Sequence, residues 1–126
     1  MTTPDEESGR LDVDLTVRLT EAPGGPQRTF RLEGAGGTPG AGSTLPDPAA
    51  ALEAVQRFGE TIFFPRPGPP KICTQQYGGP QVAVVTGWFL GRRVQSRFSR
   101  TDGCEIARWQ AMAPLLGGVA GSIGAV

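Results

Sequence analysis

The sequence predicts an α+β fold in a single domain of 126 residues. Residues 11–34 alternate apolar and polar side chains around a Pro/Gly turn, which indicates an antiparallel hairpin. Residues 81–100 contain two strand-like stretches joined around Gly91 and predict a second hairpin. Residues 47–58, between the hairpins, carry apolar side chains at helical spacing. Hairpins with a separate helix are typical of the α+β class.

The first hairpin is predicted by a strict alternation in residues 11–22, "LDVDLTVRLTEA". Its apolar positions lie on one side of an extended chain, which indicates one buried face. These positions are Leu11, Val13, Leu15, Val17 and Leu19. "PGGP" at residues 23–26 has turn chemistry, and the alternation continues through residues 27–34.

A Gly/Pro-rich loop at residues 34–48 leads into the predicted helix. Asp47 is a good N-cap, and proline is well tolerated at the next position. We expect one apolar face and an end at Gly59. The expected apolar face carries Leu52, Val55 and Phe58.

The remaining segments are predicted with less regular structure. The proline-rich run "FFPRPGPPK" at residues 63–71 excludes helix and central strand, and gives a stiff, extended segment. Residues 104–116 fit either a short helix or a strand. We expect a disordered acidic arm at residues 1–10, a domain at residues 11–116 and a loosely ordered apolar tail at residues 117–126.

The composition argues against several classes of function. Twelve basic and twelve acidic side chains cancel, and the arginines are scattered, so we expect no nucleic-acid partner. The longest apolar stretch is only as long as a strand, so we expect no membrane span. The chain has no histidine, the usual activator of a catalytic thiol and a common ligand of zinc. We therefore expect no enzyme, catalytic residue, metal or cofactor.

The chain has two cysteines, Cys73 and Cys104. They fit a disulfide or buried thiols, and the residues alone leave these alternatives open. The segment around the first, "KICTQQYGG", follows the proline-rich run and precedes an apolar strand. The first residues have neither the basic region nor the apolar region of a secretory signal peptide, which makes a cytoplasmic location an alternative to a secreted mature form.

Several motifs, in order along residues 11–107, resemble the Streptomyces-type subtilisin inhibitors, a family of small secreted serine protease inhibitors. The matching motifs are "LTV" at residues 15–17, "PGAGSTLPD" at residues 39–47, Cys73 with Tyr77, "GxRV" at residues 91–94, and Cys104 with Glu105. The likeness rests on their order, because no single motif is specific.

The resemblance implies a five-stranded antiparallel sheet with two helices packed on one face, a homodimer, and secretion. It also implies a Cys73–Cys104 disulfide and an exposed loop that binds a protease as a substrate does. The reactive loop consists of Ile72, Cys73, Thr74, Gln75, Gln76 and Tyr77. The scissile bond is Gln75–Gln76, with Gln75 as the P1 residue, which enters the specificity pocket of the protease.

Two departures from the family pattern bear on the target and on stability. Gln75 has no charge for the acidic pocket of a trypsin-like enzyme, so we expect a subtilisin-like target, whose apolar S4 site fits Ile72. Glu33 and Leu45 stand where the family has a second disulfide.

The sequence also fits other functions. The same fold can serve a non-inhibitory, dimeric binding or scaffold protein in the cytoplasm. The glutamine pair also makes the loop a candidate acceptor for a transglutaminase. We expect Trp88 in the core or at the dimer interface, and Trp109 to pack the C-terminal segment against the domain.

Overall fold

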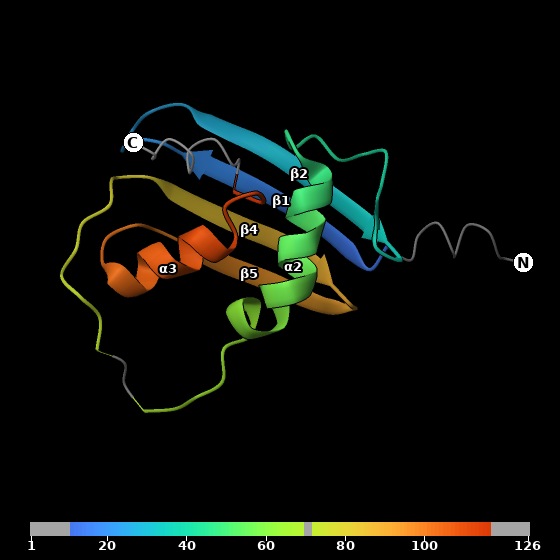
Figure 1. Ribbon diagram of the computed structural model, residues 1–126. Coiled ribbons are helices and arrows are strands. Elements are labelled where there is room, and N and C mark those ends of the chain that lie inside the picture. The colour runs from blue at the N-terminus through green and yellow to red at the C-terminus, as the bar shows by residue number, and fades with distance from the viewer. Residues whose placement is uncertain (1–10, 70–71, 117–126) are drawn as a thin grey trace, which may run out of the picture.

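The computed structural model describes residues 11–69 and 72–116. The elements in this part of the chain are β1 (Val13–Thr20), β2 (Gln27–Ala35), β3 (Thr38–Pro39), α2 (Pro48–Phe63), β4 (Val82–Phe89), β5 (Arg92–Phe98) and α3 (Gly103–Ala111). The strands form one antiparallel sheet in the order β3-β2-β1-β4-β5, and both helices lie on the same face of it (Figure 1). The predicted α+β class is confirmed. The predicted arm at residues 1–10 and tail at residues 117–126 lie outside the described residues.

Both predicted hairpins are present. β1 pairs with β2, with Val17 opposite Phe30, and the turn between them is closed by a 2.9 Å hydrogen bond from the Gly25 N–H to the Ala22 carbonyl. β4 pairs with β5 across a two-residue connection in which Leu90 has φ 52° and Gly91 has φ 81°. Positive φ at both residues matches the twist of the flanking strands and favours glycine, which explains Gly91.

Helix α2 begins as predicted. The side chain of Asp47 accepts a hydrogen bond of 3.1 Å from the Ala50 N–H, and Pro48 is the first helical residue. The side of α2 that faces the sheet is apolar and covers the centre of the core. Its buried residues are Ala51, Leu52, Ala54, Val55, Gly59 and Phe63.

The prediction that Gly59 ends the helix is wrong, because α2 continues to Phe63. Gly59 is buried under Phe89, and a Cβ added to it would lie 3.2 Å from two atoms of that ring. The glycine therefore allows the helix to approach the sheet. The helix ends before Pro65, which disfavours helical geometry at the residue that precedes it.

The predicted apolar face is also corrected at one position. Leu52 and Val55 are buried, whereas Phe58 is 38% exposed. The buried face runs through Val55, Gly59 and Phe63, so Phe58 lies at its edge.

Residues 104–116 begin as a helix, which decides between the two predicted alternatives. α3 is followed by a short turn, and together they bury Trp109, Met112, Leu115 and Leu116. Trp109 thus packs the C-terminal part of the domain into the core, as predicted. The core is completed by apolar side chains of the sheet, which include Leu15, Val17, Leu32, Val85 and Phe98. Among the described residues, no helix has the length and apolar character needed to cross a membrane.

Candidate functional site

The segment between α2 and β4 contains the residues predicted as a reactive loop. Residues 65–69 lead away from α2, and residues 72–79 run beside the N-terminal end of α3 (Figure 1). Ile72 is 99% exposed and Tyr77 is 68% exposed. Thr74, Gln75 and Gln76 are also exposed. The structure therefore presents all of the predicted loop residues to solvent except Cys73, which is half-buried.

The predicted disulfide is present. Cys73 and Cys104 are bonded, with their Cα atoms 5.2 Å apart and a sequence separation of 31. The bond joins the loop to the first turn of α3. It therefore fixes the loop covalently just before the predicted scissile bond.

Hydrogen bonds hold the loop on both sides of Gln75 and Gln76. The Gly103 N–H donates to the Thr74 carbonyl at 3.0 Å, and the Gly78 N–H donates to the Arg100 carbonyl at 2.7 Å. The Nε of Arg100 also donates to the Gly78 carbonyl at 3.1 Å. One short segment, residues 100–104, therefore anchors the loop at both ends. We call this segment the anchor segment.

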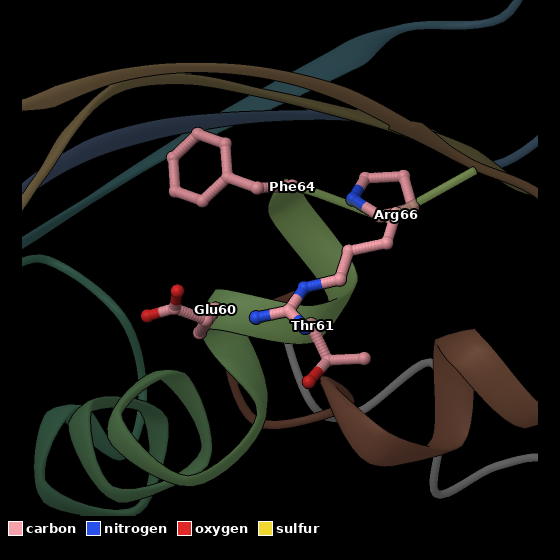
Figure 2. A pocket seen from close by; sticks show the side chains of 5 residues that line it. Glu60, Thr61, Phe64 and Arg66 are labelled. Atoms are coloured by element: carbon pink, nitrogen blue, oxygen red, sulfur yellow. The ribbon is translucent and has the colours of Figure 1, made fainter.

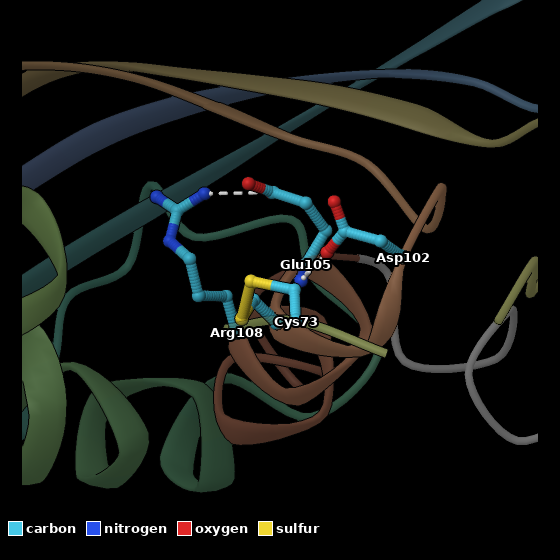
Figure 3. The surroundings of a disulfide bond; sticks show 5 residues. Cys73, Asp102, Glu105 and Arg108 are labelled. Atoms are coloured by element: carbon cyan, nitrogen blue, oxygen red, sulfur yellow. Dashed lines mark hydrogen bonds and ion pairs between the residues drawn. A yellow bond between two sulfur atoms is a disulfide. The ribbon is translucent and has the colours of Figure 1, made fainter. Parts of the chain in front are cut away.

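The anchor segment is itself fixed by the start of α3 (Figure 3). The carboxylate of Asp102 caps the helix by accepting a 2.9 Å hydrogen bond from the Glu105 N–H. Arg108 pairs with Glu105 at 3.0 Å and donates to the Arg97 carbonyl at 3.1 Å, which links α3 to β5. These contacts attach the anchor segment to α3 and α3 to β5.

Close packing supports the same arrangement. A Cβ added to Gly103 would collide with the Oγ1 of Thr74, so glycine allows these two segments of the chain to approach each other. A Cβ on Gly78 would lie 2.9 Å from the Cδ1 of Ile106 on α3. The loop therefore lies directly against the scaffold at both anchors, while Gln75 and Gln76 remain exposed between them.

Hydrogen bonds connect the two segments that a second disulfide links in the resembling family. The side chain of Glu33 accepts from the Gly42 N–H at 3.1 Å, and the Glu33 N–H donates to the Oγ of Ser43 at 2.9 Å. Leu45 is buried in the core. The end of β2 is thus attached to the loop before α2 by polar contacts.

Within residues 11–69 and 72–116, one group of side chains has the composition of a metal site, but its members are already engaged. The sulfur atoms of Cys73 and Cys104 and a carboxylate oxygen of Asp102 lie within 4.8 Å of one another. Both sulfurs belong to the disulfide, however, and Asp102 caps α3. In this oxidised form, the cluster offers no thiolate ligand.

A second surface feature, not predicted from the sequence, lies at the end of α2. A hollow of about 540 Å³ is lined by Glu60, Thr61, Phe64, Pro65 and Arg66 (Figure 2). Arg92 contacts two of these residues, since its guanidinium lies 3.8 Å from the centre of the Phe64 ring and 3.7 Å from the Glu60 carboxylate. The lining side chains are mostly exposed, so the hollow is an open surface depression.

The face of the sheet opposite the helices is the third feature. Trp88 lies on this face and is 49% exposed, which excludes the core from its two predicted locations. Arg31 pairs there with Asp14 at 2.6 Å and with Glu33 at 3.0 Å. Within the described residues, no helix covers this face.

The sequence analysis missed the anchor residues Arg100 and Gly103. Their role depends on contacts with residues far away in the sequence. The only local signal was the "DGCE" sequence, in which an aspartate cap and a glutamate three residues later predict a helix start at the cysteine.

Comparison with models of known protein families found no match, and comparison with curated proteins found no significant match. The resemblance to subtilisin inhibitors therefore rests on the sequence motifs.

Proposed function

We propose that this protein is a serine protease inhibitor related to the Streptomyces-type subtilisin inhibitors, with Gln75–Gln76 as its scissile bond. The observation that carries the proposal is the exposed loop held at both ends by the anchor segment. Thr74 and Cys73 are fixed before the scissile bond, and Gly78 is fixed after it. Anchoring of this kind supports the proposal, because a substrate-like inhibitor needs a loop whose conformational freedom is already reduced before binding.

The physical advantage of these anchors is entropic. A flexible loop loses conformational freedom when a protease orders it, at roughly 1–2 kcal/mol for each backbone residue fixed. Anchors at Thr74 and Gly78 reduce this cost in the free protein. The same anchors keep the two ends of a cleaved bond close together, which favours religation over release.

The side chains of the loop favour a subtilisin-like target. Gln75 carries no charge, and Ile72 is almost fully exposed and therefore free to enter an apolar S4 site. A trypsin-like protease is disfavoured because its acidic pocket would receive no cation from Gln75.

A secreted location is part of the same proposal. Disulfides form and persist mainly in oxidising compartments, and the Cys73–Cys104 bond joins the loop to the domain. Secretion also brings an inhibitor to the proteases that it meets outside the cell.

The test is a titration of a subtilisin-like protease with the oxidised protein and three variants. We expect near-stoichiometric inhibition by the wild type, with slow cleavage after Gln75 detected by mass spectrometry. Gln75→Leu should tighten inhibition, and Gln75→Glu should weaken it because a carboxylate would enter an apolar pocket unpaired. Gln56→Glu makes the same charge change on the exposed side of α2 and should have no effect. Rapid cleavage after Gln75, or no effect on a panel of serine proteases, would contradict the proposal.

A second candidate function is favoured by the open face of the sheet. A half-exposed tryptophan on a sheet face that no helix covers in the described part of the chain is typical of an interaction surface. In this alternative, the protein is a non-inhibitory, dimeric binding or scaffold protein on the same fold, in the cytoplasm. A homodimer that uses this face is compatible with both functions. The protease titration described above distinguishes the two functions, because only an inhibitor blocks the protease.

A further inference from the structure

The two sides of the scissile bond are held in different ways. The segment before the bond is held by the disulfide of Cys73 and by the Gly103 N–H. Residues 76–80, the segment after it, form two hydrogen bonds within the described part of the chain. Both join Gly78 to Arg100. The first side is therefore fixed covalently, whereas the second is held by packing against Ile106 and by hydrogen bonds to a single residue, Arg100.

We propose that Arg100 is the positioning residue that holds residues 76–78 in place and thereby sets the lifetime of the loop in the protease, an inference that rests on the proposed inhibitory function. Arg100 forms two hydrogen bonds with Gly78: its carbonyl accepts from the Gly78 N–H, and its Nε donates to the Gly78 carbonyl. Only two residues, Gln76 and Tyr77, separate Gly78 from the scissile bond. The position of the Gln76 nitrogen is therefore controlled by Arg100.

The side chain of Arg100 is itself held by the core. Its guanidinium lies 5.7 Å from the centre of the buried Trp109 ring, and Arg100 is half-buried. Contact with an aromatic face favours one orientation of the planar guanidinium group. Nε is consequently directed at the Gly78 carbonyl before any protease binds.

The two hydrogen bonds between Arg100 and Gly78 matter after cleavage. In an acyl-enzyme, the carbonyl carbon of Gln75 is bonded to the serine oxygen of the protease, and Gln76 has a free α-amine. Attack of this amine on the carbonyl carbon re-forms the peptide bond, and the serine oxygen leaves with the proton that the amine gives up. If residues 76–78 move away, water attacks instead, and the cleaved inhibitor is released.

The test compares Arg100→Met with two controls. Methionine keeps an unbranched side chain against Trp109 but has no donor, and the backbone bond to Gly78 remains possible. Arg100→Lys keeps the charge but places a methylene where Nε stood, so we expect no rescue. Arg57→Met removes the same charge from an exposed position on α2 and should behave as the wild type.

Three readouts are used: hydrogen exchange, the cleavage rate and the resynthesis of intact chain. The first is hydrogen exchange of the peptide covering residues 76–81 in the free protein. The second is the rate at which a subtilisin-like protease cleaves Gln75–Gln76. For Arg100→Met and Arg100→Lys we expect faster exchange and cleavage faster by about tenfold, the effect of one charge-assisted hydrogen bond. Resynthesis of intact chain from the isolated cleaved protein should fall by a similar factor.

The outcomes separate this inference from the proposed function. Unchanged exchange and cleavage in Arg100→Met overturn the role of Arg100, even if the wild type inhibits. Restoration of wild-type behaviour by lysine also overturns it, because charge alone would then suffice. If the wild type inhibits no protease but Arg100→Met is cleaved faster than Arg57→Met, the role of Arg100 in holding Gly78 is supported, and the inhibitory function fails.

Discussion

Gly103 and Thr74 are in such close contact that a side chain on the glycine has no room. The Gly103 N–H donates to the Thr74 carbonyl at 3.0 Å, and a Cβ on Gly103 would collide with the Oγ1 of Thr74. The contact joins the first turn of α3 to the residue before Gln75. It therefore couples the conformation of the loop to the start of the helix.

Gly103→Ala should loosen the loop and destabilise the domain. Crowding of this kind typically costs about 1–3 kcal/mol in the free energy of unfolding, which urea denaturation measures. Gly68→Ala is the matched control, since nothing lies within 4 Å of a Cβ at that position. Addition of Thr74→Ala to Gly103→Ala should recover part of the loss, because it removes the colliding atom. A loss equal to that of Gly68→Ala would contradict the described contact.

Reduction of the Cys73–Cys104 disulfide should lower stability. For a sequence separation of 31, the chain-entropy model gives a loss of roughly 3–4 kcal/mol in the free energy of unfolding. Urea denaturation with and without a dithiol reductant measures this difference. The double variant Cys73→Ser/Cys104→Ser should match the reduced wild type and should not respond to reductant. A wild type that is equally stable in both conditions would show that the bond constrains the unfolded chain very little.

The sequence predicted the regular elements because their patterns are local. Alternation of apolar residues identified β1 and β2, and the "DP" sequence at residues 47–48 identified the start of α2. The end of α2 could not be predicted in the same way. Gly59 resembles a stop signal, but its burial against Phe89 depends on a strand far away in the sequence.

The sequence likewise predicted only part of the candidate site. The exposed loop and its cysteine followed from composition and motif order, whereas its hydrogen-bonded anchors did not. Glycine favours a flexible backbone, yet Gly78 forms two hydrogen bonds with Arg100 and packs against Ile106. Neither contact leaves a pattern in the local sequence, because each joins residues from different elements.

Removal of the cap on α3 should weaken the helix that carries Cys104. Asp102→Ala should lower the free energy of unfolding by about 1 kcal/mol, since the Glu105 N–H loses its acceptor. Asp102→Asn keeps an acceptor oxygen and should retain most of the stability, so it is the matched control. Urea denaturation of both variants makes the comparison. Equal destabilisation by alanine and asparagine would assign the role of Asp102 to its charge and not to the cap.

Trp88 provides the test of the proposed homodimer. If two copies associate through the open face, sedimentation at micromolar concentration should show a dimer, and Trp88→Lys should convert it to a monomer, because the substitution places a charge in the interface. Phe58→Lys makes a comparable substitution at an exposed aromatic on α2, on the helical side of the sheet, and should leave the dimer intact. A wild type that sediments as a monomer would exclude the dimer. Dissociation by Phe58→Lys alone would place the interface on the helical side.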